Sequence, residues 1–502
     1  MRTNRLTFLF FIVVLAIPIF GQLQHKPIQM WDEARNGVST VEMMQNNEYF
    51  VRYFDGKPDE WEVKPPLLLW LNMGVFKVFG INLLSLRLVS AVSMFGICLL
   101  LYNFFKREFD DEIGGAVAAL MLVGSESMIR NHIARTGDHD ALLCLLLFGS
   151  LITFFKYLKY QHYKYLIYTA LLTAAAVLTK SVVGFFYALG FGIFLLFSWQ
   201  FLRNLLAQKA FYVAVLLVVG IVGGYYGIAE MHHAGHFTHV WNMELLPRYV
   251  NENPTGMVFN VLEDKFYYVK KMIFEDRFAW WALLLPSFLF WFGWESKEKK
   301  WLAQVCWAIV LSLSAVIAMG CANDWYDAPI FVPMAILAGM VVSRLIRGAL
   351  AVTDAQIICI LPKSLMIFIL FAAFFGFSYF KTVQKNVTLQ EPSFSGNYAP
   401  AMRSLLEHHR QISDNYHVVF SEYPAPVYFM RYWAREKGVK ITPHLLVNNV
   451  KPENYPKFQI GDKIFTSEQE VMDILLMYYD LRSVFEEGPS KLLEVYGLKK
   501  AQ

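Results

Sequence analysis

Apolar segments close to the length of a membrane-spanning helix recur along the first three quarters of the chain. They fall at residues 6–22, 84–105, 113–129, 141–155, 165–179, 182–200, 211–230, 279–293, 302–320, 327–343 and 364–380, and the apolar tract 350–361 is a candidate half-helix. A helix needs about 20 predominantly apolar residues to cross a bilayer, whereas a transmembrane barrel shows short segments of alternating hydrophobicity. The pattern therefore predicts a polytopic α-helical membrane protein with about 11 to 13 transmembrane helices.

The pattern changes near residue 383. The remaining residues alternate polar and apolar positions, with a helix expected at 399–412, strands at 418–422, 439–446 and 458–465, and a second helix at 467–479. We therefore expect two domains: a transmembrane domain at 1–382, which includes an outer loop at 23–83, and a soluble α/β domain at 383–502. Within the first domain only Lys180-Ser181 separates two apolar segments, which predicts a tight turn there.

Positively charged residues occur in every second gap between the apolar segments. If the N-terminus is inside, the inner gaps contain Arg2, Arg5, Lys106, Arg107, Lys156, Lys159, Lys164, Arg203, Lys209, Lys297, Lys299, Lys300, Arg344, Arg347 and Lys363. Inner loops of membrane proteins carry such an excess. The same orientation places the unusual polar segments on the outer face: 23–83, 130–140, Lys180, 231–278, 323–327 and the C-terminal domain.

Composition supports a membrane protein and excludes other classes. Of 502 residues 56% are hydrophobic and 17% are charged, against about 25% charged residues in soluble domains. The formal net charge is +4, without a basic stripe, so no nucleic-acid partner is predicted. All five cysteines lie in or beside apolar segments, where they read as small buried hydrophobes.

The outer loop 23–83 contains two candidate site motifs. Asp32-Glu33 offers adjacent carboxylates that cannot share one helix face. One of them is a candidate general base, and the other would form an ion pair, with Arg35 as a possible partner. The alternative interpretation is that both are solvated acids of a loop. Lys64 precedes two prolines, which keeps it extended and lets an amphipathic helix start at 67–79. A lysine beside a helix start can bind an anion, or it can simply extend its charge to the membrane surface.

The turn 130–140 and Lys180 add charges at the membrane boundary. Asp140 stands directly before an apolar segment and needs a partner, for which Arg135 is the candidate; Asp138 is a further acid in the same run. A purely structural ion pair is the competing interpretation. Lys180 is either a second cation for a phosphate or an anchor at headgroup level.

Two later segments complete the candidate site. In 231–249, His232 and His236 have the i, i+4 spacing of metal ligands, but no acid lies at helical spacing among the histidines, so interfacial histidines are favoured. Glu244 and Arg248 follow, and Arg248 suits bidentate contact with a phosphate. Tyr326 lies in an aromatic and polar helix start, for which an interfacial aromatic belt is the alternative.

Taken in order, these motifs resemble the polyprenyl-phosphate-sugar glycosyltransferases of the GT-C superfold. The likeness is greatest to the bacterial lipid A aminoarabinose transferases and the protein O-mannosyltransferase-like enzymes, and it covers roughly residues 1–345. It rests on Asp32-Glu33-Ala34-Arg35, Lys64-Pro65-Pro66-Leu67, Phe79-Gly80, Arg87-Leu88, Ala134-Arg135, Asp140, Leu178-Thr179-Lys180, Arg248-Tyr249 and Tyr326.

The resemblance implies a GT-C-like fold in the bacterial inner membrane, with the active site and C-terminal domain in the periplasm. It implies inverting transfer of a sugar from a polyprenyl phosphate such as undecaprenyl phosphate to a lipid, glycan or protein acceptor, as in lipid A modification or protein O-glycosylation. Asp32 would be the base and Asp140 the second catalytic aspartate. Donor-phosphate ligands would be Lys64, Lys180, Arg248 and Tyr326, with site-supporting roles for Glu33, Arg35, Arg135, Asp138 and Glu244.

The chain departs from the aminoarabinose transferases at two positions. Those enzymes tend to have Glu before Lys-Pro-Pro and His-Glu before the arginine segment, where this chain has Val63 and Met243. Because the two replaced residues are associated with a metal near the acceptor site, the departures argue against a metal and against lipid A as acceptor. We assign no metal ligand and no certain cofactor, and a divalent metal stays open.

Two other functions compete with the transferase. An oligosaccharide ligase or polymerase would depend on arginines and a histidine, and a transporter or lipid flippase would show repeats and polar residues at mid-membrane. Here the polar residues gather at one face and no repeat is found, which favours the transferase. The sequence leaves open the sugar, the acceptor, the length of the lipid carrier, the oligomeric state and the exact helix count.

Overall fold

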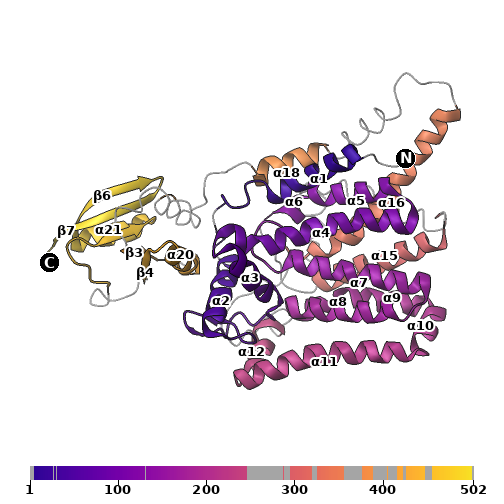
Figure 1. Ribbon diagram of the computed structural model, residues 1–502, viewed down its shortest axis with the longest axis horizontal. Coiled ribbons are helices and arrows are strands. Elements are labelled where there is room, and N and C mark those ends of the chain that lie inside the picture. The colour runs from indigo at the N-terminus through magenta and orange to yellow at the C-terminus, as the bar shows by residue number, and fades with distance from the viewer. Residues whose placement is uncertain are drawn as a thin grey trace.

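The computed structural model describes residues 5–26, 28–29, 31–130, 132–245, 296–318, 325–355, 376–387, 415–421, 425–446 and 455–499, with isolated residues 287, 294 and 404. Its larger part is a bundle of helices that run side by side (Figure 1). The bundle helices are α1 (Arg5–Phe20), α4 (Leu83–Phe109), α5 (Glu112–Gly124), α7 (Asp140–Tyr160), α8 (Lys164–Lys180), α9 (Phe186–Phe197), α11 (Lys209–His232), α15 (Lys297–Ala318), α16 (Ala328–Ala355) and α18 (Phe377–Val387).

Six apolar helical stretches in the described part are long enough to cross a membrane. The largest core lies inside the bundle, with Leu101, Leu122, Phe148, Ile309 and Leu337 contributed by five different helices. The polytopic α-helical fold predicted from the apolar pattern is thus confirmed. The predicted segment 113–129 is divided into α5 and the short α6 (Glu126–Ile129), while 279–293 and 364–380 lie wholly or largely outside the described residues.

The predicted tight turn at Lys180-Ser181 is present. Helix α8 ends at Lys180, Ser181 takes a positive φ of 49°, and a 3-10 helix (Ser181–Phe185) leads into α9. The turn packs directly on the backbone of α8, since a Cβ placed on Gly184 would lie 2.2 Å from the nitrogen of Val177. Only glycine permits this close approach, which brings the chain back across the bundle.

The segment 23–83 contains more regular structure than the helix expected at 67–79. The segment forms α2 (Asp32–Asn46), a small hairpin of β1 (Tyr53–Phe54) and β2 (Lys57–Pro58), and α3 (Leu67–Phe79). Helix α3 has the predicted bounds. Helix α2 escaped prediction because it buries hydrogen-bonded polar residues such as Asn36, Thr40 and Glu42, which dilute the apolar stripe by which a helix is recognised.

The C-terminal part is an α/β domain, as predicted. Its strands are β3 (Asn415–Phe420), β4 (Lys440–Leu445), β5 (Lys463–Thr466), β6 (Tyr479–Glu487) and β7 (Ser490–Leu498), in the order β4-β3-β5-β7-β6. Strand β3 pairs in parallel with β4 and β5, and β7 pairs antiparallel with β5 and β6. Alternate residues of β3 face opposite layers: Val418 packs with α20 (Ala425–Glu436), and Val419 packs with α21 (Gln469–Tyr478).

Strands near 418–422 and 439–446 and the helix at 467–479 match the predictions. The strand expected at 458–465 begins only at Lys463. Three elements were not predicted: α20, β6 and β7. The helix expected at 399–412 lies outside the described residues. The division at 382/383 stays a prediction, and α18 runs across that position.

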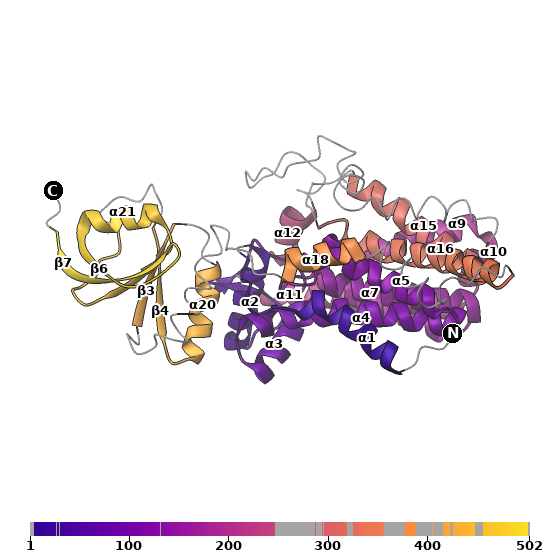
Figure 2. The ribbon, with the colours of Figure 1, turned by 90° about the horizontal axis from the view of Figure 1, so that it is seen from above.

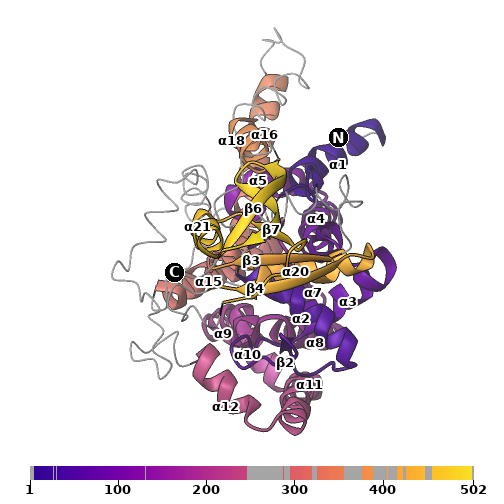
Figure 3. The ribbon, with the colours of Figure 1, turned by 90° about the vertical axis from the view of Figure 1, so that its left-hand side faces the viewer.

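The α/β domain packs on α2 at one end of the bundle, as seen from above in Figure 2 and end-on in Figure 3. Phe429 of α20 lies so close to Gly37 of α2 that a Cβ there would be 2.5 Å from its ring. The hydroxyl of Tyr432 donates to Glu42 at 2.6 Å. The same end also carries α3, α12 (His236–Val240) and a π-helical turn (Trp241–Leu245), while α10 (Trp199–Leu206) lies at the opposite end.

Candidate active site

Asp32 and Glu33 occupy the first turn of α2, where carboxylates interact favourably with the helix dipole. Neighbouring residues of a helix point about 100° apart, and the two acids accordingly have different surroundings. The Glu33 side chain is fully buried and forms a two-point ion pair with Arg87, at 2.6 and 2.9 Å. Asp32 is about one-third exposed and lies 3.7 Å from Nζ of Lys64. The Glu33 carboxylate is therefore fully occupied by structural contacts, whereas the Asp32 carboxylate stays partly open to solvent.

Lys64 is fixed by the extended Lys-Pro-Pro segment that leads into α3. Its Nζ donates to Oε2 of Glu62 at 2.9 Å, and Arg52 approaches the other oxygen of Glu62 at 3.6 Å. Burial lowers the pKa of Lys64, but the neighbouring carboxylates, Asp32 first, outweigh burial and raise that pKa above its ordinary value. Burial likewise raises the pKa of Glu62, but the charges of Lys64 and Arg52 hold it well below its usual range. Lys64 and Glu62 are therefore both ionised at neutral pH.

The turn before α7 brings a third acid to the same place. The hydroxyl of Thr136 donates to Asp138 at 2.5 Å, and Nδ1 of His132 lies 3.7 Å from the same carboxylate. Burial, with the nearby charge of Asp32, raises the pKa of Asp138 to about 7. The next residue, His139, is buried, and burial together with Lys64 lowers its pKa well below the ordinary value, so its imidazole is neutral.

Asp140 and Lys180 form a buried two-point ion pair, with Nζ at 2.7 and 2.8 Å from the two carboxylate oxygens. The ammonium also lies 5.4 Å from the centre of the Tyr326 ring, a cation–π distance. The charges of both Lys64 and Lys180 contribute to the lowered pKa of His139, the residue directly before Asp140. The structure thus gathers Asp32, Lys64, Asp140, Lys180 and Tyr326 at one end of the bundle.

Two predicted pairings are wrong. Arg135 does not pair with Asp140: it donates to the carbonyls of Pro18, Ile19 and Gly21, which end α1. The buried acid of the Asp32-Glu33 pair, Glu33, pairs with Arg87, and Arg35 pairs with Asp59, at 2.6 and 2.8 Å. In each case the partner is distant in sequence. The supporting roles of Arg35 and Arg135 in the site stay predictions.

Glu244 is buried in the π-helical turn, and its charge acts on Lys64. Arg248, the predicted phosphate ligand, lies outside the described residues. Several residues of the cluster were not predicted as site residues: Asn36, Arg52, Glu62, His132 and His139. Glu62 could have been found from its two-residue spacing to Lys64, but no signal in the sequence marks Arg52 or Asn36.

Among the described residues, two groups of side chains could hold a metal ion. The ligand atoms of Asp32, His132 and Asp138 lie within 4.8 Å of one another, as do those of Glu60, His233 and His239. The metal pair implied by the aminoarabinose transferases does not fit this chain. Its positions are taken by Val63, which is buried and has no ligand atom, and by Met243.

Residues 63–224 match the family of dolichyl-phosphate-mannose-protein mannosyltransferases. The structure of ArnT from Cupriavidus metallidurans bound to undecaprenyl phosphate is similar over 98% of both chains, with a TM-score of 0.68 at 14% identity. The apo oligosaccharyltransferase of Archaeoglobus fulgidus matches 88% of this chain and 64% of its own, with a TM-score of 0.52 at 13% identity. The chain has the GT-C fold.

An uncharacterized protein of Aquifex aeolicus is 25% identical over 299 residues. This match covers 58% of the GT-C chain and 55% of the relative, so the chain spans about half the length of that relative. The resemblance drawn from the motifs is confirmed at the level of the fold, and residues 63–224 match the mannosyltransferase family model. The individual roles of the site residues remain predictions.

Proposed function

We propose that this protein is an inverting glycosyltransferase. It moves a sugar from a polyprenyl phosphate, such as undecaprenyl phosphate, to a lipid, glycan or protein acceptor on the outer face of a bacterial inner membrane. The observation that carries the proposal is the gathering of Asp32, Lys64, Asp140 and Lys180 at one end of the bundle. The ArnT structure bound to undecaprenyl phosphate, which has the same fold, supports the choice of donor.

The proposed reaction is a single displacement. Asp32 takes the proton of the acceptor, whose oxygen attacks the anomeric carbon from the face opposite the phosphate. The bond between that carbon and the phosphate oxygen breaks, and polyprenyl phosphate leaves with the electron pair. One base and one displacement invert the anomeric centre, as in inverting glycosidases.

Cations take the place of a general acid in this scheme, because a phosphate is already a good leaving group. Lys64, Lys180 and Arg248 would neutralise its developing charge, and Tyr326 would bind beside them. Asp140 would orient Lys180, which it contacts with both oxygens. Glu62 and Arg52 would fix Lys64 in the same way.

The test uses the full chain in nanodiscs with undecaprenyl phosphate as the probe. Lys64→Ala and Arg248→Ala should weaken lipid binding about ten-fold or more, as expected for loss of a charged hydrogen bond. Lys77→Ala, on the exposed face of α3, is the matched control and should bind like wild type. Equal binding by Lys64→Ala would contradict the donor site.

Asp32→Asn should keep lipid binding and lose transfer. The assay follows release of undecaprenyl phosphate from synthetic undecaprenyl-phosphate sugars in the presence of membrane acceptors, and loss of a general base costs about 100- to 10,000-fold. Normal turnover by Asp32→Asn would overturn the base assignment. Lipid transfer between leaflets without any sugar release would favour a flippase. A parallel assay offers an undecaprenyl-pyrophosphate-linked glycan, and release of undecaprenyl pyrophosphate from it would favour an oligosaccharide ligase.

A further inference from the structure

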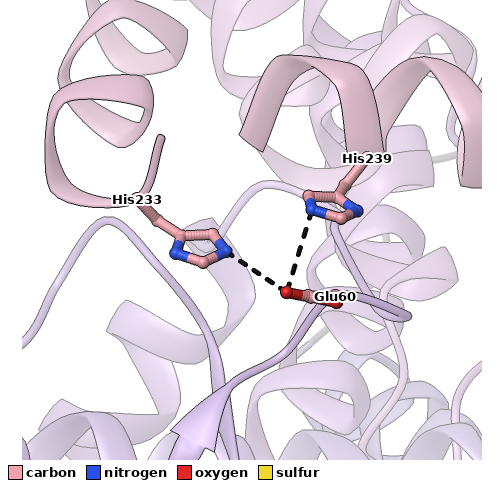
Figure 4. Close-up of side chains that lie close together, drawn as sticks. All are labelled: Glu60, His233 and His239. Atoms are coloured by element: carbon pink, nitrogen blue, oxygen red, sulfur yellow. Dashed lines mark ion pairs between the residues drawn. The ribbon is translucent and has the colours of Figure 1, made fainter. Parts of the chain in front are cut away.

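Three metal-ligand side chains from separate segments lie close together and point toward one another, as Figure 4 shows. Glu60 follows the small hairpin, His233 follows the end of α11, and His239 lies in α12. Oε1 of Glu60 is 3.8 Å from Nε2 of His233 and 3.9 Å from Nε2 of His239. The residues lie beyond the ends of the membrane-spanning helices, where water and ions have access.

The distances fit a shared ion better than direct hydrogen bonds. An N–H donor bonds a carboxylate oxygen at about 2.7 to 3.2 Å, which neither histidine reaches. Nε2 of His233 is shielded from solvent and has no hydrogen-bond partner in the described structure, a costly state for a buried polar atom. Zinc ligands at about 2.0–2.1 Å in a tetrahedron lie about 3.3 Å apart, so small side-chain rotations would close the observed gaps.

The backbone holds the two rings in this arrangement. The carboxylate of Glu230 accepts hydrogen bonds from the nitrogens of Gly235, at 2.7 Å, and Phe237, at 2.8 Å. Gly235 has a φ of +90°, so the turn between α11 and α12 depends on glycine. The rings of His233 and His239 are nearly parallel, at 16°, and both present Nε2 to the same oxygen of Glu60.

The other two histidines of this segment point elsewhere. Nδ1 of His232 pairs with Glu48 at 2.9 Å, and His236 is buried beside the ring of Tyr226. The i, i+4 pair expected from the sequence is therefore not the pair that converges. No acid lies at helical spacing among these histidines, because the acid that meets them, Glu60, comes from the loop after the hairpin. That loop lies more than 170 residues earlier in the chain.

We propose that Glu60, His233 and His239 bind a zinc ion. Two imidazole nitrogens and one carboxylate oxygen form a ligand set that zinc accepts, with a fourth position open to water. The ion would tie the loop that carries Asp59, Glu62 and Lys64 to the turn that leads into Glu244. This inference is independent of the proposed transferase activity, because it concerns ligand geometry alone.

The test measures metal binding by the full-length protein in detergent after removal of metals with a chelator. Wild type should take up about one zinc ion per chain, and cobalt in its place should give the intense visible bands of a four-coordinate site. The double variant His233→Ala/His239→Ala and the single variant Glu60→Gln should each weaken zinc binding at least about 100-fold, since even outer-shell changes cost 10- to 100-fold.

His232→Ala is the matched control, because it removes the adjacent histidine without touching the ligand set, and it should bind zinc like wild type. All variants are compared without metal by their apparent Tm, which shows whether they fold. A wild type that takes up no zinc would overturn the proposal. So would unchanged zinc uptake by the double variant, and zinc lost only in Asp138→Asn would place the ion on the other cluster.

Discussion

The adjacent carboxylates at the start of α2 allow a direct test of how burial separates structural from chemical roles. We compare Asp32→Asn with Glu33→Gln, which remove the same charge from neighbouring positions with little change in volume. The first should lower the free energy of unfolding very little and the second should lower it strongly. If Asp32 is the base, Asp32→Asn should lose transferase activity although its stability stays close to that of wild type.

The expected magnitudes follow from the contacts. Each oxygen of Glu33 accepts two hydrogen bonds: one from Arg87 and the other from a backbone nitrogen, Gly137 at 3.0 Å or Gln29 at 2.7 Å. An amide at this position turns one acceptor into a donor that faces two donors, and it leaves the buried guanidinium without its counter-charge. Breaking one side of a buried ion pair costs about 3–5 kcal/mol.

Asp32 makes a weaker contact. Its carboxylate is about one-third exposed and lies 3.7 Å from Nζ of Lys64, which keeps Glu62 at 2.9 Å when Asp32 is neutralised. Partly exposed pairs of this kind contribute about 0–1 kcal/mol. Glu33→Gln should therefore lower the free energy of unfolding several times more than Asp32→Asn does.

Both variants are purified in the same detergent and heated while tryptophan fluorescence is recorded. The apparent Tm serves as a ranking, since membrane proteins commonly unfold irreversibly. Glu33→Gln should melt well below wild type and Asp32→Asn close to it. Equal losses, or a larger loss in Asp32→Asn, would refute the assignment of Glu33 to the fold and Asp32 to the chemistry.

Two further predictions concern the surroundings of the site. Because burial raises the pKa of Asp138 to about 7, the folded chain binds its proton more tightly than the unfolded chain. The stabilising contribution of the protonated Asp138 is full below pH ~4 and is lost as the pH rises through about 7. The apparent Tm should therefore fall less steeply over this pH range in Asp138→Asn than in wild type. An equal slope in the two proteins would contradict the raised pKa of Asp138. Gly37→Ala places a Cβ 2.5 Å from the ring of Phe429 and should weaken docking of the α/β domain by about 1–3 kcal/mol. Faster hydrogen exchange in α20 measures this, and Gly74→Ala, which meets open space, should leave exchange unchanged.

The sequence predicts those features that depend on local rules. Helix α3 begins where Lys64-Pro65-Pro66 requires it, and the chain turns at Ser181 because two apolar runs leave no other room. The hairpin of β6 and β7 was also readable: Gly488-Pro489 separates two runs with strand-like alternation.

Features that depend on distant contacts could not be predicted in this way. Asp140 was expected to need a cation, and it has one, but the cation is Lys180, 40 residues away, rather than the nearby Arg135. Helix α2 buries polar residues because distant segments cover it: Glu33 pairs with Arg87, Asn36 contacts Arg52, and Glu42 accepts a hydrogen bond from Tyr432. Nothing in the sequence of α2 itself indicates these partners. The candidate metal ligands were missed for the same reason, since Glu60 and the histidines come from different segments.

The pairing of Lys64 links donor binding to activation of the base under the proposed function. Lys64 is already neutralised, so a phosphate must take the place of one of its carboxylates. Glu62 is held by Lys64 at 2.9 Å and by Arg52 at 3.6 Å, whereas Asp32 contacts Lys64 only at 3.7 Å.

The phosphate should therefore displace Asp32. This displacement would free the Asp32 carboxylate from its contact with Lys64 when the sugar it must help to transfer arrives. Before that event Asp32 lies against Lys64, so an acceptor alone meets a carboxylate that is already paired. The arrangement favours an ordered reaction in which the donor binds before the acceptor is deprotonated.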